Sequence, residues 1–230
     1  AQSDYTVDLR IGDEILKGVT DSYRKLRNTA RFLLGNLSAH SDLVDISYDK
    51  LPDLEKHILH RVCEVDKKIR SSYENYSFQS VFQTYFQFCT QDLSSFYFDI
   101  RKDVLYCDPE TSLKRRATLK VLDILFFRLT TWFSPILPFT MEEVYLERFP
   151  ELENSVHLLD IPSNEKDWYN PKHAIGWDKI RNVRRVVTGA IEVLRQEKVI
   201  GSSLETCPVI HIKDKELYDI IKLVDMSEIC

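Results

Sequence analysis

The spacing of apolar residues predicts helices over most of the chain. In the first helix, which should begin at a capping Asp13, apolar side chains recur at intervals of three and four residues: Val19, Tyr23, Leu26, Ala30, Leu33 and Leu37. The same spacing continues over residues 51–76, 78–106, 112–133 and 177–198. Thr140 and Glu143 have the spacing of a capping box and predict a short helix that ends before Pro150.

These helices divide the chain into three predicted parts. Residues 1–150 should form a helical bundle, and residues 151–175, which lack periodicity, should form a linker. Residues 176–230 contain the long last helix, ended by Gly201, and a β-branched run over 208–213 that predicts a strand. The fold class is therefore mainly α: a helical bundle, a linker, a long helix and the start of a small α+β module.

The composition favours helices, and the distribution of charge along the chain differs from what the net charge suggests. Only 6 glycines and 8 prolines occur in 230 residues, so long helices are easily sustained. The net charge of −5 argues against a nucleic-acid binder, but residues 17–31 carry five Lys or Arg against one Asp, and residues 179–198 carry six against two Glu. A phosphate backbone responds to local charge, because charge more than about 10 Å away is screened at ordinary salt. Local basic stripes are therefore compatible with RNA.

Other features narrow the class of protein. Five cysteines without paired spacing, and the lack of an apolar run of about 18 residues, indicate a cytoplasmic protein without a disulfide framework or a membrane contact. The first residue is Ala1 rather than Met, which suggests a piece of a longer protein. His57, His60, Cys63 and Glu64 share a helix face, but they lack a specific ligand motif, and no metal is predicted.

The first helix carries the strongest candidate binding residues. Helical geometry places Arg24, Arg27, Asn28 and Arg31 on one stripe beside the apolar face. Cations can hold phosphates, and an amide can read a base edge. Further candidate RNA-binding cations are Lys102, Arg115, Arg116, Arg181, Arg184 and Arg185. The alternative is that these charges form solvated helix faces.

Several runs of residues follow one another in the order of a known family. They are YRKLRNTARFLLGNL at 23–37, LSSFYFDIRKDVLY at 93–106, RR at 115–116, SPILPFTMEEVY at 134–145, VHL at 156–158 and KVIGSSLE at 198–205. Together they resemble the anticodon-binding domain of isoleucyl-tRNA synthetase, a class I aminoacyl-tRNA synthetase, over nearly the whole chain.

The resemblance implies a division of labour within a longer protein. The parent would be an isoleucine-tRNA ligase that uses ATP and Mg²⁺, with catalytic and editing domains elsewhere in the same polypeptide. This piece would bind the anticodon stem-loop of isoleucine tRNA without a cofactor, as part of a cytoplasmic monomer. It lacks the His-x-Gly-His and Lys-Met-Ser-Lys-Ser motifs of class I synthetases, so no catalytic residue is expected. The alternatives are the same domain of a valyl-, leucyl- or methionyl-tRNA synthetase, or a non-enzymatic helical scaffold for protein interactions.

Overall fold

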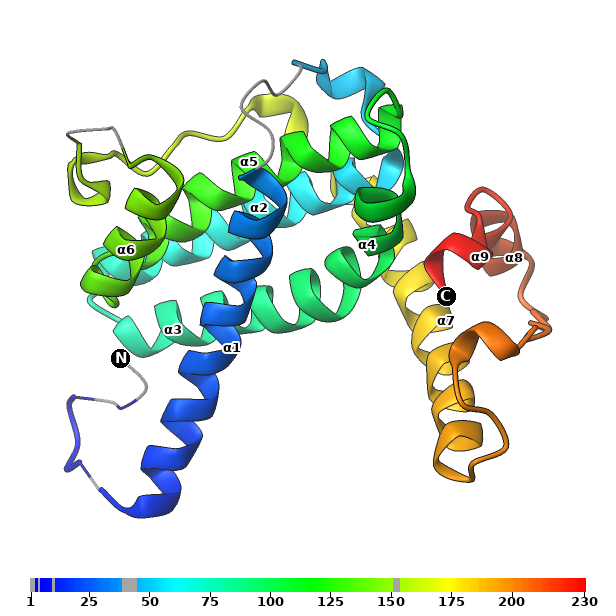
Figure 1. Ribbon diagram of the computed structural model, residues 1–230, viewed down its shortest axis with the longest axis horizontal. Helices are drawn as coiled ribbons and strands as arrows, with labels where there is room; N and C mark the ends of the chain where they lie inside the picture. The colour runs from blue at the N-terminus through cyan, green and yellow to red at the C-terminus, as the bar shows by residue number, and fades with distance from the viewer. Residues whose placement is uncertain (1–2, 4, 10, 39–44, 151–153) are drawn as a thin grey trace. The chain divides into compact units, whose positions relative to one another are not determined.

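A computed structural model describes residues 3, 5–9, 11–38, 45–150 and 154–230 (Figure 1). The chain forms two compact units, Ala1–Tyr169 and Asn170–Cys230, here called the bundle unit and the C-terminal unit. The segment 151–175, predicted as a linker, is divided between them at residue 169. The prediction of a mainly α fold is confirmed for the described part of the chain, because the regular elements there are all helical.

The bundle unit contains six α-helices and four short or irregular helical segments in its described residues. They are α1 (Asp13–Leu37), η1 (Tyr48–Lys50), α2 (Asp53–Glu74), α3 (Phe78–Gln87), η2 (Phe88–Tyr97), α4 (Phe98–Cys107), α5 (Leu113–Phe133), α6 (Pro138–Arg148), η3 (Val156–Leu158) and η4 (Lys166–Trp168). Figure 1 shows α1 crossing the other helices, with its first half extending beyond them. Residues 11–20 are accordingly exposed throughout.

The segments α3, η2 and α4 form one continuous helical rod with a π-helical centre. The backbone remains right-handed helical at both junctions of η2, which spans ten residues. Ser94 donates a hydrogen bond from Oγ to the carbonyl of Cys89, five residues earlier, at 2.8 Å. A π-helix turns more slowly than an α-helix, so η2 changes the face that α4 presents relative to α3.

Aromatic side chains fill the core of the bundle unit. Phe88, Phe126, Phe133, Tyr97 and Trp132 are among the largest fully buried side chains. The rings of Tyr85 and Phe133 stack with centroids 4.0 Å apart. Burying such surface is the main favourable term in folding.

Two buried ionic clusters fix the helices and the segment that follows them. Glu55 in α2 accepts hydrogen bonds from Arg101 in α4, at 2.6 and 2.8 Å, and from Tyr97 and Thr118 at 3.2 Å each. This first cluster ties α4 to both α2 and α5.

Asp66 is the centre of the second cluster. It accepts hydrogen bonds from Trp132 at 2.8 Å, Arg70 at 2.8 Å and Asn164 at 2.9 Å. Arg70 and Arg128 also donate to backbone carbonyls between residues 161 and 163. These contacts hold the segment before η4 on the bundle unit.

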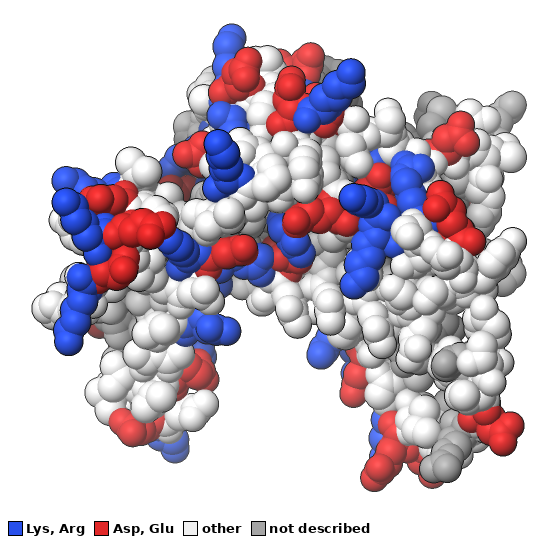
Figure 2. Space-filling view, turned by 180° about the vertical axis from the view of Figure 1, so that it is seen from behind, with Lys and Arg blue, Asp and Glu red and all other residues white. Residues whose placement is uncertain are grey.

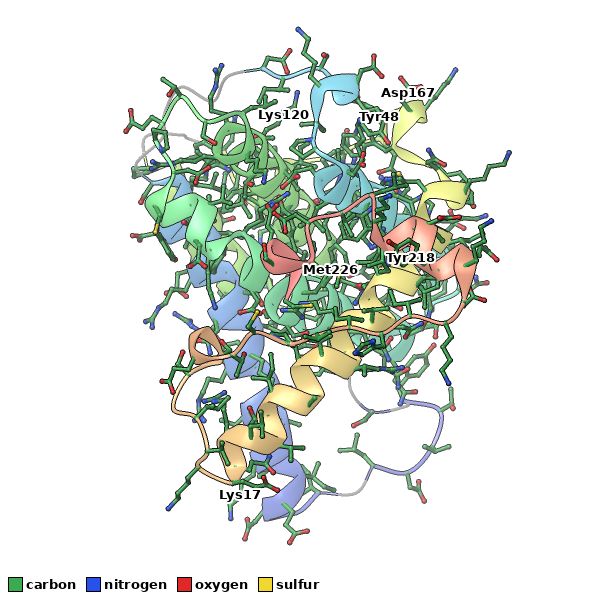
Figure 3. All side chains as sticks on the ribbon, turned by 90° about the vertical axis from the view of Figure 1, so that its right-hand side faces the viewer. Lys17, Tyr48, Lys120, Asp167, Tyr218 and Met226 are labelled. Carbon is green, nitrogen blue, oxygen red and sulfur yellow. The ribbon has the colours of Figure 1, made fainter. Side chains whose placement is uncertain are left out.

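Lys120 of α5 holds the segment before η1 in a similar way. Its Nζ donates to the carbonyl of Ile46 at 2.7 Å and pairs with Asp45. Figure 3 shows Lys120 in the same region of the molecule as Tyr48 of η1, far from Lys17 near the beginning of α1.

The C-terminal unit consists of α7 (Pro171–Gln196), η5 (Ser203–Glu205), α8 (Lys215–Ile221) and α9 (Met226–Ile229) in its described residues. Trp177, Ile180, Val183, Val187 and Ile191 form the buried face of α7. The apolar spacing predicted Ile180, Val183, Val187 and Ile191 on this face, and also Leu194, whose side chain is instead 37% exposed.

Two local predictions are wrong. The last long helix begins at Pro171 instead of 177, because Asn170 accepts a hydrogen bond from the backbone of His173 and proline suits the first helical turn. It ends at Gln196, within two residues of the predicted end at Lys198, and Lys198 takes a left-handed conformation with φ 58°. The capping box does not form either: Leu137 precedes α6, and Pro138 occupies its first turn.

The predicted strand over 208–213 is also absent. No part of this segment belongs to a strand. A strand requires a hydrogen-bonded neighbour, and the described residues supply none, so its β-branched side chains alone do not produce a sheet.

Candidate nucleic-acid interface

A groove lies between α1 and α6 in the bundle unit, with a volume of about 840 Å³. The first wall is α1, which contributes the whole predicted stripe: Arg24, Arg27, Asn28 and Arg31. The opposite wall is α6, which contributes Glu143, Glu147 and Arg148. Apolar parts of the lining come from Ala30, Leu34 and Val144. The structure therefore brings the predicted stripe to one open concave surface.

Arg27 is the most constrained side chain of this groove. Its guanidinium donates to both carboxylate oxygens of Glu143, at 3.1 and 3.3 Å, and to the hydroxyl of Tyr23 at 3.2 Å. Tyr23 in turn shares a 3.0 Å hydrogen bond with Thr140. These contacts orient Arg27 while leaving 48% of its side chain exposed.

The same contacts change the acidities of two groups. Hydrogen bonds with Thr140 and then Arg27 lower the pKa of Tyr23, because they stabilise its phenolate. The hydroxyl of Tyr23 and the carboxylate of Glu143 raise the pKa of Arg27. Arg27 thus carries a fixed positive charge at any ordinary pH.

The other members of the stripe are less engaged. Arg24 pairs with Asp21 at 3.2 Å, and both side chains are largely exposed. Asn28 and Arg31 are exposed, and neither makes a hydrogen bond or ion pair with another described residue. Exposed pairs such as Arg24 with Asp21 contribute about 0–1 kcal/mol, so an external anion can replace them at little cost.

The other predicted cations of the bundle unit differ in accessibility. Lys102 is exposed and forms an ion pair with Asp99 at 2.9 Å. Arg115 is half-buried and donates to the carbonyl of Asp108 at 2.6 Å, which holds the loop before α5. Arg116 is also half-buried, and its Nε has no hydrogen-bond partner among the described residues. None of the three lines the groove.

In the C-terminal unit, the predicted cations lie on α7. Arg184 donates from Nε to the carbonyl of Ile229 at 2.6 Å, so it helps to hold α9. Arg185 is exposed and contacts Asn182 at 3.1 Å. Arg181 is partly exposed on the same helix. Arg185 is therefore the most accessible of the three, and Arg184 has an evident structural role.

Charges of both signs share the surface of the molecule. Figure 2 shows Lys and Arg side chains interleaved with Asp and Glu side chains in that view. Within the described part of the chain, no three His, Cys, Asp or Glu side chains come together as a metal-binding group. No helix among the described residues has an apolar stretch long enough to cross a bilayer.

Sequence reasoning did not identify the acidic wall of the groove. Glu143 and Glu147 are four residues apart and therefore share a face of α6, a signal that the sequence does contain. The sequence does not indicate that this face lies opposite the arginines of α1, because that depends on how the two helices pack.

Comparison with known proteins places this geometry in context. Residues 55–211 match the family described as the anticodon-binding domain of tRNA ligase. The chain is 53% identical over 231 residues to an isoleucine–tRNA ligase of Ruegeria pomeroyi, which covers 100% of the chain and 24% of that protein. It is 50% identical over 228 residues to the isoleucine–tRNA ligase of Agrobacterium fabrum, covering 99% of the chain and 23% of that protein.

The chain thus spans about a quarter of the length of the curated relatives it matches. The match to the family begins at residue 55 and does not include α1, whereas the alignment with the relative from Ruegeria pomeroyi covers the chain completely. The helix that carries the arginine stripe is therefore part of the region shared with that relative.

Proposed function

Because the chain belongs to the family of anticodon-binding domains of tRNA ligases, we propose that it binds the anticodon stem-loop of isoleucine tRNA and positions it for an isoleucine-tRNA ligase. The observation that supports this best is the groove between α1 and α6. It combines three arginines and one amide on a single helix wall, where phosphates and base edges can both be reached.

The residues of the groove would contact different parts of the RNA. Arg24 and Arg31 would contact phosphates, because both line the groove with exposed side chains, and the only ion pair that either makes with a described residue is the exposed pair of Arg24 with Asp21. Asn28 would read a base, because its amide offers two donors and an acceptor and has no partner among the described residues. Lys102 and Arg185 would add phosphate contacts outside the groove, and Arg115, Arg116, Arg181 and Arg184 would contribute less directly.

The parent activity that we propose is the ATP-dependent joining of isoleucine to its tRNA. ATP and Mg²⁺ would act in other parts of the polypeptide, which would include catalytic and editing domains. The described residues would contribute by placing the anticodon, and the full protein would work as a monomer in the cytoplasm. Aminoacylation assays of the full-length parent with isoleucine, valine, leucine and methionine would test this assignment.

Fluorescence anisotropy with labelled anticodon stem-loops tests the role of Asn28. We expect wild type to prefer the isoleucine stem-loop over the valine stem-loop, and Asn28→Ala to reduce that preference. A lost bidentate base contact corresponds to about 1–3 kcal/mol of discrimination. Equal preference in wild type and Asn28→Ala would contradict the reading role of this amide.

A competition experiment separates RNA recognition from attraction to charge in general. Unlabelled isoleucine tRNA should displace the labelled stem-loop, whereas an unstructured polyanion such as polyphosphate should compete poorly. Equal competition by polyphosphate would favour the alternative of a helical scaffold for acidic partners.

A further inference from the structure

The acidic wall of the groove is unexpected for a surface that only holds phosphates. Glu143 and Glu147 line the groove on α6, the wall across from α1, and both are exposed. Each carboxylate repels a phosphate, which offers only acceptors and negative charge. Beside these carboxylates, the lining therefore suits a group that presents donors as well as acceptors better than it suits a phosphate.

A nucleobase has the required chemistry. Its edge carries amino or imino donors beside carbonyl or ring-nitrogen acceptors, and its faces are apolar enough to lie on Ala30, Leu34 and Val144. Carboxylates accept from base amino groups, and arginine donates to base acceptors. The groove volume of about 840 Å³ is ample for one base with its sugar.

Glu143 is placed to act as an acceptor for such a base. Each carboxylate oxygen of Glu143 accepts one hydrogen bond from Arg27, at 3.1 and 3.3 Å. The second lone pair of each oxygen remains available to a ligand, because 60% of the Glu143 side chain is exposed. The neighbouring Glu142 has a different role, since its Oε2 accepts from the hydroxyl of Ser155 and the backbone of Val156 at 2.8 and 2.9 Å.

We infer that the groove between α1 and α6 receives one unstacked base of the RNA loop, and that Glu143 is the specificity-determining residue that accepts its amino or imino group and keeps phosphates off Arg27. This inference rests on the proposed function and deepens it. Glu143 occupies the Nη1 and Nη2 side of the Arg27 guanidinium, so a phosphate could bind that side only by displacing Glu143, whereas a base can bind beside the intact ion pair.

The test combines variants of the whole chain with modified RNA. The ligand is an isoleucine anticodon stem-loop in which each loop nucleotide is made abasic in turn. At one position, the abasic change should weaken binding by wild type about 10-fold, as expected for a lost base contact. In Glu143→Gln the same abasic change should weaken binding by only about 3-fold, because Asn28 can still contact the base but the acceptor for its amino or imino group is lost. Glu143→Gln should also bind polyphosphate about 3-fold more tightly, because a charge that repels phosphates is gone.

A steric variant tests the groove without changing its charge. Gly35 lines the groove, and a Cβ added there would meet no atom within 4 Å. Gly35→Leu should fill the space and remove the sensitivity to the abasic position. Gly18→Leu is the matched control, because Gly18 lies in the same helix, has equally open surroundings and does not line the groove. Glu74→Gln, an exposed carboxylate on α2, controls for lost charge.

The outcomes distinguish the inference from the proposed function. If wild type binds the stem-loop but no abasic position matters, or if Glu143→Gln and Gly35→Leu retain the wild-type sensitivity, the base pocket is overturned while stem-loop binding stands. If wild type does not bind the stem-loop, both proposals fail. Circular dichroism melts of each variant show whether the bundle unit is intact. If Glu143→Gln is folded, a reduced sensitivity to the abasic position cannot come from unfolding.

Discussion

The buried pair of Glu55 and Arg101 gives the sharpest prediction for stability. Their side chains are 0% and 3% exposed, so neither charge is solvated when its partner is removed. Breaking a buried pair by removing one partner typically costs about 3–5 kcal/mol. Glu55→Gln should therefore destabilise the bundle unit by about 3–5 kcal/mol and lower its Tm by roughly 6–20 °C.

The double variant tests the mechanism behind this cost. Glu55→Leu combined with Arg101→Met should recover a large part of the loss, because no charge remains buried. Recovery should be incomplete, since Tyr97 loses an acceptor for its hydroxyl. Thr118 loses less, because its hydroxyl also donates to the carbonyl of Lys114 at 2.8 Å.

Urea denaturation followed by tryptophan fluorescence measures these changes in the bundle unit. A Trp177→Phe background removes the tryptophan of the C-terminal unit and leaves Trp132 and Trp168, which belong to the bundle unit. Lys102→Ala is the control, because its ion pair is exposed and should contribute less than about 1 kcal/mol. A cost below about 1 kcal/mol for Glu55→Gln would refute the reasoning, since it would mean that water reaches Arg101.

Two further predictions concern individual side chains. Gly35→Ala should raise the stability of the bundle unit by about 0.5–1 kcal/mol in a thermal melt, because alanine favours the helix and its Cβ meets no atom; a lower Tm would contradict this. Burial raises the pKa of Cys63 to about 11, so at pH 8 it should resist alkylation, while the exposed Cys107 and Cys207 are labelled readily. Peptide mapping by mass spectrometry distinguishes them, and rapid labelling of Cys63 in the native protein would show that its site is open.

Apolar spacing was sufficient to predict most of the bundle helices. The first helix was expected from Asp13 to about Leu37, where α1 indeed lies, because its stripe persists over many turns. Asp13 does not cap it, however: Gly12 is the N-cap, and no side chain caps this end. The π-helical segment η2 was not predicted, since a local change of helical period does not disturb the apolar pattern enough to be recognised. The strand over 208–213 was predicted from β-branched residues, but strand formation depends on a neighbour that local sequence does not reveal.

The candidate site, too, was predictable only in the part that depends on local sequence and not in the part that depends on tertiary packing. The positions of Arg24, Arg27, Asn28 and Arg31 on one stripe follow from helical geometry alone. Their position in a groove follows from the packing of α1 against α6, and so does the ion pair of Arg27 with Glu143. The sequence therefore placed the cations on one stripe, whereas the carboxylates that line the groove with them required the structure.

The dependence of stem-loop binding on salt tests the central claim most directly. Arg31 should contact a phosphate, so Arg31→Ala should weaken binding to isoleucine and valine stem-loops alike and reduce the slope of log K against log salt by about 1. Lys17→Ala is the matched control, since Lys17 is an exposed cation about 21 Å along α1 from Arg31 at 1.5 Å per residue. The account predicts a smaller slope for Arg31→Ala and an unchanged slope for Lys17→Ala; identical slopes for wild type and Arg31→Ala would contradict it.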